Sequence, residues 1–220
     1  MDAHTRVSFD EQLKELQQDL LRMGGAVEQM LFKCVKALVE RDIPLADETI
    51  QMDDIVDGYN LDIEMKCLRL LALQQPMARD LRTIAATLKI ITDVERMGDY
   101  AVDIAKTARI LSEKPLFKPL VDIPKMAELV QKMLRESLEA FVKRDTAMIE
   151  KIVKEDDEVD RLNRTLHDEL VVYIEKDPTL ASQAVRLILI ARYLERIADH
   201  ITNVCERIYY METGNIKELH

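Results

Sequence analysis

The sequence predicts an all-α protein built as a tandem repeat of two three-helix, up-down-up bundles, with six long helices in total. Apolar residues recur at three- and four-residue spacing through most of the chain, which is the period of a helix packed on one face. Charged residues make up 33% of the 220 residues and glycine occurs only five times, a composition typical of long helices. Segments of the first half also recur in the second half, which indicates two copies of one domain.

The internal repeat is clearest when the chain is shifted against itself by 103 residues, which aligns 37–60 with 140–163. Nine of these 24 aligned pairs are identical, far more than chance would supply. The shift falls to 102 between Pro76 and Pro178, and small deletions in loops explain this drift because loops tolerate length changes. The period is the size of a small domain and too long for a solenoid repeat.

The first half is expected to form three helices separated by turns at Pro44 and Pro76. Proline suits the first turn of a helix but cannot continue one. Ser8 suits the N-cap of the first helix, and Gly24 and Gly25 inside it would bend it or let a neighbouring helix come close. The expected helices span residues 8–41, 44–75 and 77–111.

The second half repeats this pattern after a linker that contains proline. Residues 113–124 hold three prolines, and Pro178 stands where Pro76 stands in the first half. We therefore expect a first bundle at 1–112 and a second bundle at 125–220, joined by this linker. The expected helices of the second bundle span residues 125–144, 146–176 and 179–211.

Carboxylates recur at four-residue spacing in both halves, and residues at this spacing are neighbours on one helix face. Like charges at this spacing repel each other, so folding alone gives little reason to stack them. The helices joined at Pro76 run antiparallel, so carboxylates from both can lie at similar heights. The candidate metal ligands are Asp53, Asp57, Glu95, Asp99 and Asp103 in the first half, and Asp156, Asp160, Glu195, Asp199 and Asn203 in the second half.

Oxygen ligands contributed by facing helices are how helical bundles hold hard metal ions. The expected ions are magnesium, manganese, calcium or ferric iron, with zinc as an alternative. The same pattern also fits a solvated acidic face balanced by neighbours such as Arg96, Arg192 and Arg196. His200 has Tyr100 as its counterpart in the first half, so it is expected to be a polar-face residue rather than a ligand.

Composition and motifs exclude several classes of function. The net charge of −10 argues against nucleic-acid binding, which needs a basic surface. The three cysteines are widely spaced and odd in number, which favours a reducing compartment over a disulfide framework. No apolar stretch is long enough to cross a bilayer. No nucleophile, phosphate-binding glycine loop or Glu-x-x-His motif is present, so we expect no catalytic residues and no enzyme.

The paired motifs Glu-Arg-Met-Gly-Asp at 95–99 and Glu-Arg-Ile-Ala-Asp at 195–199, within two three-helix sets, resemble the PhoU family of phosphate-transport accessory regulators. The stretches 8–24 and 75–82 are also similar to that family. Ala198 stands where the family motif has glycine, and this adds only a methyl group. The resemblance implies that the family's metal motifs fall on Asp53 with Asp57, Glu95 with Asp99, Asp156 with Asp160 and Glu195 with Asp199.

The resemblance also implies a function. Such a protein would be cytoplasmic, homodimeric and peripheral to the inner membrane. It would damp the phosphate-starvation response by contacting the ATPase of a phosphate ABC transporter and a sensor histidine kinase. Two other classes stay open from the residues alone: a metalloenzyme that uses the carboxylates in catalysis, and a helical scaffold that holds no ion.

Overall fold

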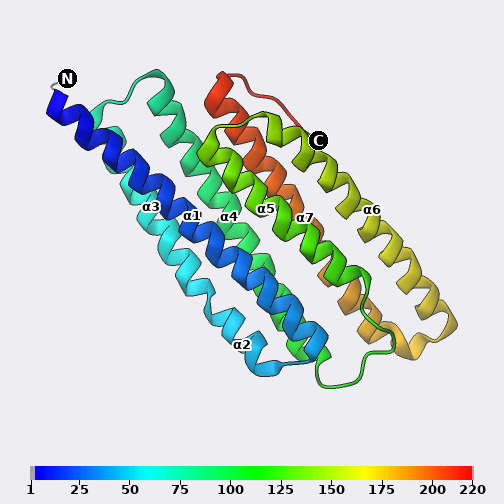
Figure 1. Cartoon of the computed structure of the whole chain (residues 1–220). Coiled ribbons are helices and arrows are strands. Elements are labelled where there is room, and N and C mark those ends of the chain that lie inside the picture. Colours follow the sequence, from blue (N-terminus) through cyan, green and yellow to red (C-terminus); the bar gives the residue numbers. More distant parts are fainter. Residues whose placement is uncertain (1–2, 220) are drawn as a thin grey trace.

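The chain folds into long helices that lie side by side in one elongated slab (Figure 1). The computed structural model describes residues 3–219, and no strand occurs among them. The expected all-α class and the repeat of three-helix sets are confirmed. The helices are α1 (Ala3–Glu40), α2 (Ile43–Gln51), α3 (Asp53–Gln74), α4 (Ala78–Leu111), α5 (Asp122–Lys143), α6 (Ala147–Lys176) and α7 (Ala181–Thr213), with a short 3-10 turn η1 (Pro178–Leu180) before α7.

The largest differences from the predicted helix boundaries occur at three places, and the other boundaries shift by at most two residues. The expected helix 44–75 is divided at Met52 into α2 and α3, because the Met52 N–H and carbonyl make three-residue turn bonds to Thr49 and Ile55. The first helix begins at Ala3, so Ser8 lies inside it and is not its N-cap. α5 begins three residues earlier than expected, with Pro124 inside its first turn, where the missing N–H costs no hydrogen bond.

The duplication is visible in how matching helices end. Arg41 follows α1 and Arg144 follows α5, and both adopt a left-handed conformation with φ of 57°. The next residue in each half is an aspartate whose side chain accepts a backbone hydrogen bond at the start of the following helix, Asp42 as the N-cap of α2 and Asp145 one residue before the N-cap of α6. Asp42 accepts a bond from a backbone N–H at 3.0 Å, and Asp145 accepts one at 2.9 Å. The identical Arg-Asp pairs of the sequence repeat are therefore equivalent helix ends.

The two halves pack through their inner helices. α4 contacts α7 and α1 contacts α5, whereas α3 and α6 lie at opposite edges of the slab (Figure 1). α4 and α7 run antiparallel, so a rotation about an axis between them relates one half to the other. The buried apolar residues of both halves form one continuous core.

Gly24 lets α1 and α5 approach each other closely. A Cβ atom placed on Gly24 would lie 2.3 Å from Cδ1 of Leu138, whereas one on Gly25 would meet open space. The helix runs through both glycines without a break. Of the two roles expected for this pair, close approach of a neighbour is therefore the one that Gly24 fills.

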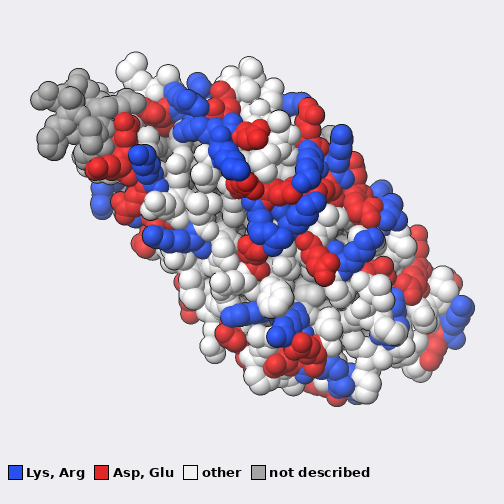
Figure 2. Space-filling view, viewed as in Figure 1, with Lys and Arg blue, Asp and Glu red and all other residues white. Residues whose placement is uncertain are grey.

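Charges of both signs are mixed over the visible face of the molecule (Figure 2). Lysine and arginine side chains lie between aspartate and glutamate side chains, and neither sign gathers into a large field. None of the helices in the described chain is both long enough and apolar enough to span a membrane.

Candidate metal centre

The first carboxylate cluster lies where α3 packs on α4. Asp53 and Asp57 come from the first turns of α3, and Glu95 and Asp99 come from the middle of α4. Burial raises the pKa of the Asp53 carboxyl, the charges of Asp57 and Asp99 raise it further, and Lys106 opposes them. Asp53 therefore lies within electrostatic reach of carboxylates from both helices.

Glu95 shows the same grouping from the other helix. Burial raises the pKa of its carboxyl, Asp99 raises it further, and Arg96 lowers it, with smaller upward contributions from Asp57 and Asp53. Repulsion of this kind costs folding free energy, so the cluster attracts cations. The structure thus places these four carboxylates, from two antiparallel helices, within electrostatic reach of one another.

Asp103 extends this cluster along α4. A surface hollow of about 240 Å³ is lined by Asp53, Asp99 and Asp103, together with two basic side chains. Arg96 donates to Asp99 Oδ2 at 2.8 Å, and Lys106 Nζ lies 4.0 Å from Asp103 Oδ1. The hollow therefore offers oxygen ligands, and two cationic side chains already supply part of the counter-charge.

The second cluster lies between α6 and α7 and centres on Glu195, which is only 9% exposed. Burial raises the pKa of its carboxyl, and Asp199 and Asp160 raise it further, while Arg192 and Arg196 lower it. Arg192 donates to Glu195 Oε1. The other oxygen, Oε2, is buried and accepts no hydrogen bond from any described residue. A buried carboxylate oxygen without a donor is a position that a cation would satisfy.

Asp156 and Asp199 lie on the same two helices, Asp156 near Cys205 and Asp199 near Glu195. Burial raises the pKa of the Cys205 thiol to about 12, and the Asp156 charge adds to this, so Asp156 lies beside α7. Asp199 accepts a bond from Arg196 at 3.0 Å, which matches the bond from Arg96 to Asp99 in the first half. The structure therefore places Asp156, Asp160, Glu195 and Asp199 along the same pair of helices.

The carboxylates do not approach within the coordination distance that the ladders suggested. Among residues 3–219, no group of three or more His, Cys, Asp or Glu side chains is positioned to hold a metal ion. The physical reason is visible in both halves, because arginines occupy the space next to the acids and serve as counter-ions. Carboxylate oxygens suit a hard cation, but Asp99, Glu195 and Asp199 would have to give up their arginine contacts to bind one.

Asn203 is turned away from the second cluster. Its amide nitrogen donates to Asp93 Oδ1 at 3.2 Å, and the His200 ring nitrogen Nδ1 lies 2.9 Å from the same oxygen. Asp93 belongs to α4, so these bonds join the two halves of the molecule. His200 therefore lies at the contact between halves.

The contact between halves is made twice, with different chemistry each time. Asp93 on α4 contacts Asn203 on α7. Their counterparts in the repeat, Tyr193 and Asp103, also lie close to each other. Burial raises the pKa of Tyr193, and the Asp103 charge raises it further. The Tyr100 ring stacks between Tyr193 and His200, at 5.8 and 5.9 Å. Asp93 was not predicted from the sequence, because its second-half counterpart is Tyr193 and the repeat gives no signal there.

Comparisons with known proteins match the chain from end to end. A family model described as the PhoU domain matches twice, at residues 20–108 and 123–208. A curated relative from Clostridium acetobutylicum, named phosphate-specific transport system accessory protein PhoU homolog, is 40% identical over 98% of this chain and 99% of its own length. A relative of the same name from Aquifex aeolicus is 40% identical over 93% of each chain.

Solved structures agree with these relatives. The crystal structure of PhoU from Pseudomonas aeruginosa superimposes with a TM-score of 0.90 at 36% identity, covering 94% of this chain and 100% of that one. The phosphate transport system regulatory protein PhoU from Streptococcus pneumoniae gives a TM-score of 0.89 at 32% identity, covering 96% of this chain and 99% of that one.

Proposed function

Because the chain belongs to the PhoU family, we propose that it is a regulatory adaptor of a phosphate ABC transporter. The observation that carries this proposal is full-length similarity to proteins named as accessory or regulatory components of phosphate transport. In this proposal the protein acts as a cytoplasmic homodimer. It contacts the transporter ATPase and a sensor histidine kinase, and it damps the phosphate-starvation response when phosphate is plentiful. The names of the relatives also support a non-enzymatic role.

The proposal includes hard cations at both carboxylate clusters. Asp53, Asp57, Glu95 and Asp99, with Asp103 beside them, would hold cations in the first half. Asp156, Asp160, Glu195 and Asp199 would do so in the second half, and Asn203 would join only by leaving Asp93. Two features support this: mutual repulsion within each cluster, and the buried Glu195 Oε2 without a donor.

The clusters would act as charge switches for partner binding. A bound cation supplies positive charge that cancels the acidic stripe. Without it, Asp53, Asp57 and Glu95 repel an acidic partner surface, which weakens association. While no cation is bound, Arg96 donates a hydrogen bond to Asp99 and Arg196 donates one to Asp199, which fixes these carboxylates in place. The long rigid helices then present these stripes to the partner at fixed spacing.

A scaffold that holds no ion is the second candidate. The arginines that contact Asp99, Glu195 and Asp199 favour it, because they already neutralise part of each cluster. In this alternative the clusters affect only the stability of the fold, and partner binding depends on other surfaces. The two candidates differ in whether removing the carboxylates changes regulation or only stability.

The test removes four carboxylates and follows partners and regulation in cells. The variant combines Glu95→Gln, Asp99→Asn, Glu195→Gln and Asp199→Asn. A matched control removes four exposed acids outside the clusters, namely Glu113→Gln, Glu128→Gln, Glu175→Gln and Asp168→Asn. Each tagged protein replaces the native one in phosphate-replete cells. Co-purification of the ATPase and kinase is then measured together with a phosphate-starvation reporter.

The adaptor proposal predicts that wild type and control retain both partners and keep the reporter low. The four-carboxylate variant should lose partners and raise the reporter while its circular dichroism stays unchanged. If wild type captures neither partner and deletion of the gene leaves the reporter unchanged, the adaptor proposal is wrong. If the variant regulates normally and only its thermal stability changes, the scaffold alternative is correct.

A further inference from the structure

The outer face of α3 carries an apolar stripe that nothing in the described chain covers. Leu61 is 60% exposed, Met65 is 52% exposed and Leu68 is 47% exposed. These residues are spaced four and three apart, and the exposed Gly58 and Ala72 continue the same spacing at either end. This alternation of three and four residues is the seam along which two helices pack as a coiled coil.

The equivalent helix of the second half serves as an internal control. The buried residues Val56, Ile63 and Cys67 of α3 correspond to Val159, Leu166 and Leu170 of α6, so the two helices share one register. At the five outer positions, however, α6 carries almost only charge. The residues equivalent to the stripe are Arg161, Arg164, Asp168, Val171 and Glu175. The apolar stripe therefore belongs to the first half alone and is not a general property of the repeat.

We propose that a second copy of this chain docks on this stripe, with the two α3 helices antiparallel about a two-fold axis near Met65. The stripe is symmetric about that point, as a two-fold interface requires. Met65 meets the partner's Met65, and Leu61 meets the partner's Leu68. Gly58 meets the partner's Ala72, and these two small residues let the helix ends come close.

Charges beside the stripe fit the same arrangement. Asp62 and Arg69 flank the stripe on one side, and neither side chain forms a hydrogen bond or ion pair with another residue of 3–219. In the antiparallel pair Asp62 lies opposite the partner's Arg69, and the two-fold axis makes this contact twice. The unused charges of the monomer are therefore complementary between copies.

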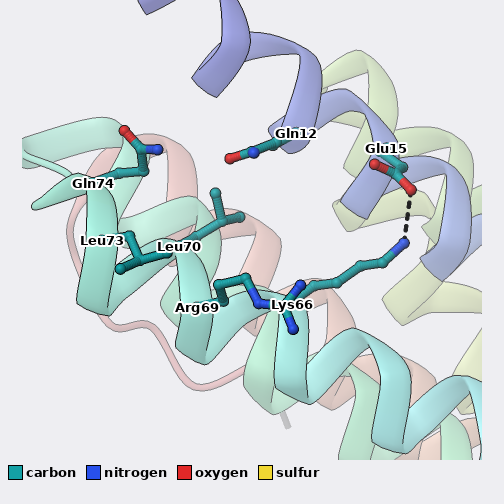
Figure 3. Close-up of a pocket in the computed structure, with 7 residues that line it drawn as sticks. All are labelled: Gln12, Glu15, Lys66, Arg69, Leu70, Leu73 and Gln74. Atoms are coloured by element: carbon teal, nitrogen blue, oxygen red, sulfur yellow. Dashed lines mark hydrogen bonds and ion pairs between the residues drawn. The ribbon is translucent and has the colours of Figure 1, made fainter. Parts of the chain in front are cut away.

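Figure 3 shows Arg69 among the side chains that line a hollow beside α3. It lies at a hollow of about 230 Å³ between α1 and α3, beside Leu73 and Gln74. Lys66 in the same hollow is already engaged, since its Nζ donates to Glu15 at 2.9 Å and to Asp19 at 2.6 Å. Arg69 is the cation of this hollow that is left to receive a carboxylate from outside.

A parallel pair of α3 helices fits less well. It would place Glu64 near the partner's Arg69, which is favourable, but it would also place Asp57 near the partner's Asp62 on both sides. The antiparallel pair leaves only one repulsive contact, between Glu64 and the partner's Glu64. The flanking charges therefore select the antiparallel arrangement.

This inference rests on the homodimer in the proposed function and is independent of metal binding and of the transporter. Its first test measures the mass of purified full-length protein by sedimentation at micromolar concentration. Met65→Glu brings two carboxylates together at the axis and should convert a dimer into a monomer. Val172→Glu is the control, because it places the same charge at a 44% exposed apolar position on α6. It should leave the dimer unchanged.

The second test fixes the orientation by charge reversal. Asp62→Arg and Arg69→Asp should each weaken the dimer by roughly tenfold, since each replaces two attractive contacts with two repulsive ones. The double variant should restore wild-type affinity. Glu64→Gln should strengthen an antiparallel dimer and weaken a parallel one.

Each contrary outcome overturns a definite part of the inference. A wild-type monomer at these concentrations overturns the docking of a second copy. If such a monomer binds another protein through the stripe, so that Met65→Glu abolishes that binding, the docking of a second copy is overturned as well. If Met65→Glu stays dimeric, the α3 face is the wrong interface, although the homodimer of the proposed function stands. If the double charge reversal restores nothing, the antiparallel arrangement is wrong.

Discussion

The two carboxylate clusters descend from one duplicated pattern, yet they lie in different surroundings. The first lies where α3 begins; Asp53 and Glu95 are half-buried there, and Asp53 lines an open hollow. The second lies within the unbroken helix α6 and against α7, where Glu195 is buried. Duplication therefore copied the acids, whereas the residues around them decide how strongly each cluster needs a counter-ion.

The difference in counter-charge follows from a few substitutions between the halves. Arg192, which contacts Glu195, has Thr92 as its first-half counterpart, and Asp103 is matched by the uncharged Asn203. The first cluster therefore has one acid more, and its guanidinium is exposed rather than held on a buried carboxylate. We expect the first cluster to attract external cations more strongly and the second to depend more on its own arginines.

The largest expected effect is on stability in the second half. Arg192→Gln leaves Glu195 charged, buried and without its donor, and should lower the free energy of unfolding by about 2 kcal/mol at neutral pH. Arg96→Gln in the first half should change it little, because that guanidinium is solvent-exposed. Urea denaturation followed by circular dichroism measures both. Equal losses of unfolding free energy in Arg192→Gln and Arg96→Gln would contradict the difference between the clusters.

A smaller effect is expected at the motif position where the halves differ by one methyl group. Ala198→Gly should lower the free energy of unfolding by about 1 kcal/mol, because glycine is less favourable than alanine inside a helix. Gly98→Ala should raise it by roughly half that, since the new Cβ would lie 3.4 Å from Val56 Cγ1, an ordinary contact. Thermal unfolding checks both. A large loss from Gly98→Ala would show that the first half needs glycine for packing.

Metal affinity should respond in the opposite sense to stability. Because Arg96 and a cation compete for Asp99, Arg96→Gln should raise the affinity of the first cluster for Mn²⁺ by roughly threefold. Lys106→Gln should act in the same direction, since it also removes positive charge from the hollow. Isothermal titration measures the change. Weaker binding in Arg96→Gln would mean that the arginine supports the site rather than competing for it.

The smallest expected effect is on pH dependence. The pKa of Glu95 and of Glu195 is raised above the ordinary value of 4.5, so the folded protein holds these protons more tightly than the unfolded chain. Their stabilising contribution is full below pH 4.5 and is lost as the pH rises through the raised values. At neutral pH without metal, Glu95→Gln should therefore be more stable than wild type, by on the order of half a kcal/mol after solvent screening. Denaturation of Glu95→Gln and wild type below pH 4.5 and at neutral pH checks the sign of the stability difference.

Much of the fold could be predicted because its signals are local. Pro44, Pro76 and Pro178 mark the turns between helices, because proline cannot continue a helix. The break at Met52 could not be predicted this way. The apolar period continues across it, through the buried Thr49, Met52 and Val56, so the pattern looks like one helix. Only the turn bonds at Met52 divide it.

The site was partly predictable for the same reason. Four-residue spacing correctly grouped Asp53 with Asp57 and Glu95 with Asp99, because spacing on one helix is a local property. It could not show that arginines would lie next to them, nor that Asn203 would bond Asp93 across 110 residues of sequence. The outer stripe of α3 could have been predicted from the sequence but was not. Aligning Leu61 and Met65 with Arg164 and Asp168 shows it directly.

Metal content measured separately in the two halves tests the central claim most directly. Protein stripped with a chelator is reloaded with Mn²⁺ and analysed by elemental mass spectrometry, alongside Asp53→Asn with Asp99→Asn and Asp156→Asn with Asp199→Asn. The account predicts that wild type retains Mn²⁺, that each double variant loses the part bound by its own half, and that the first half holds its part more tightly. Wild-type protein that retains no more Mn²⁺ than either double variant would contradict it.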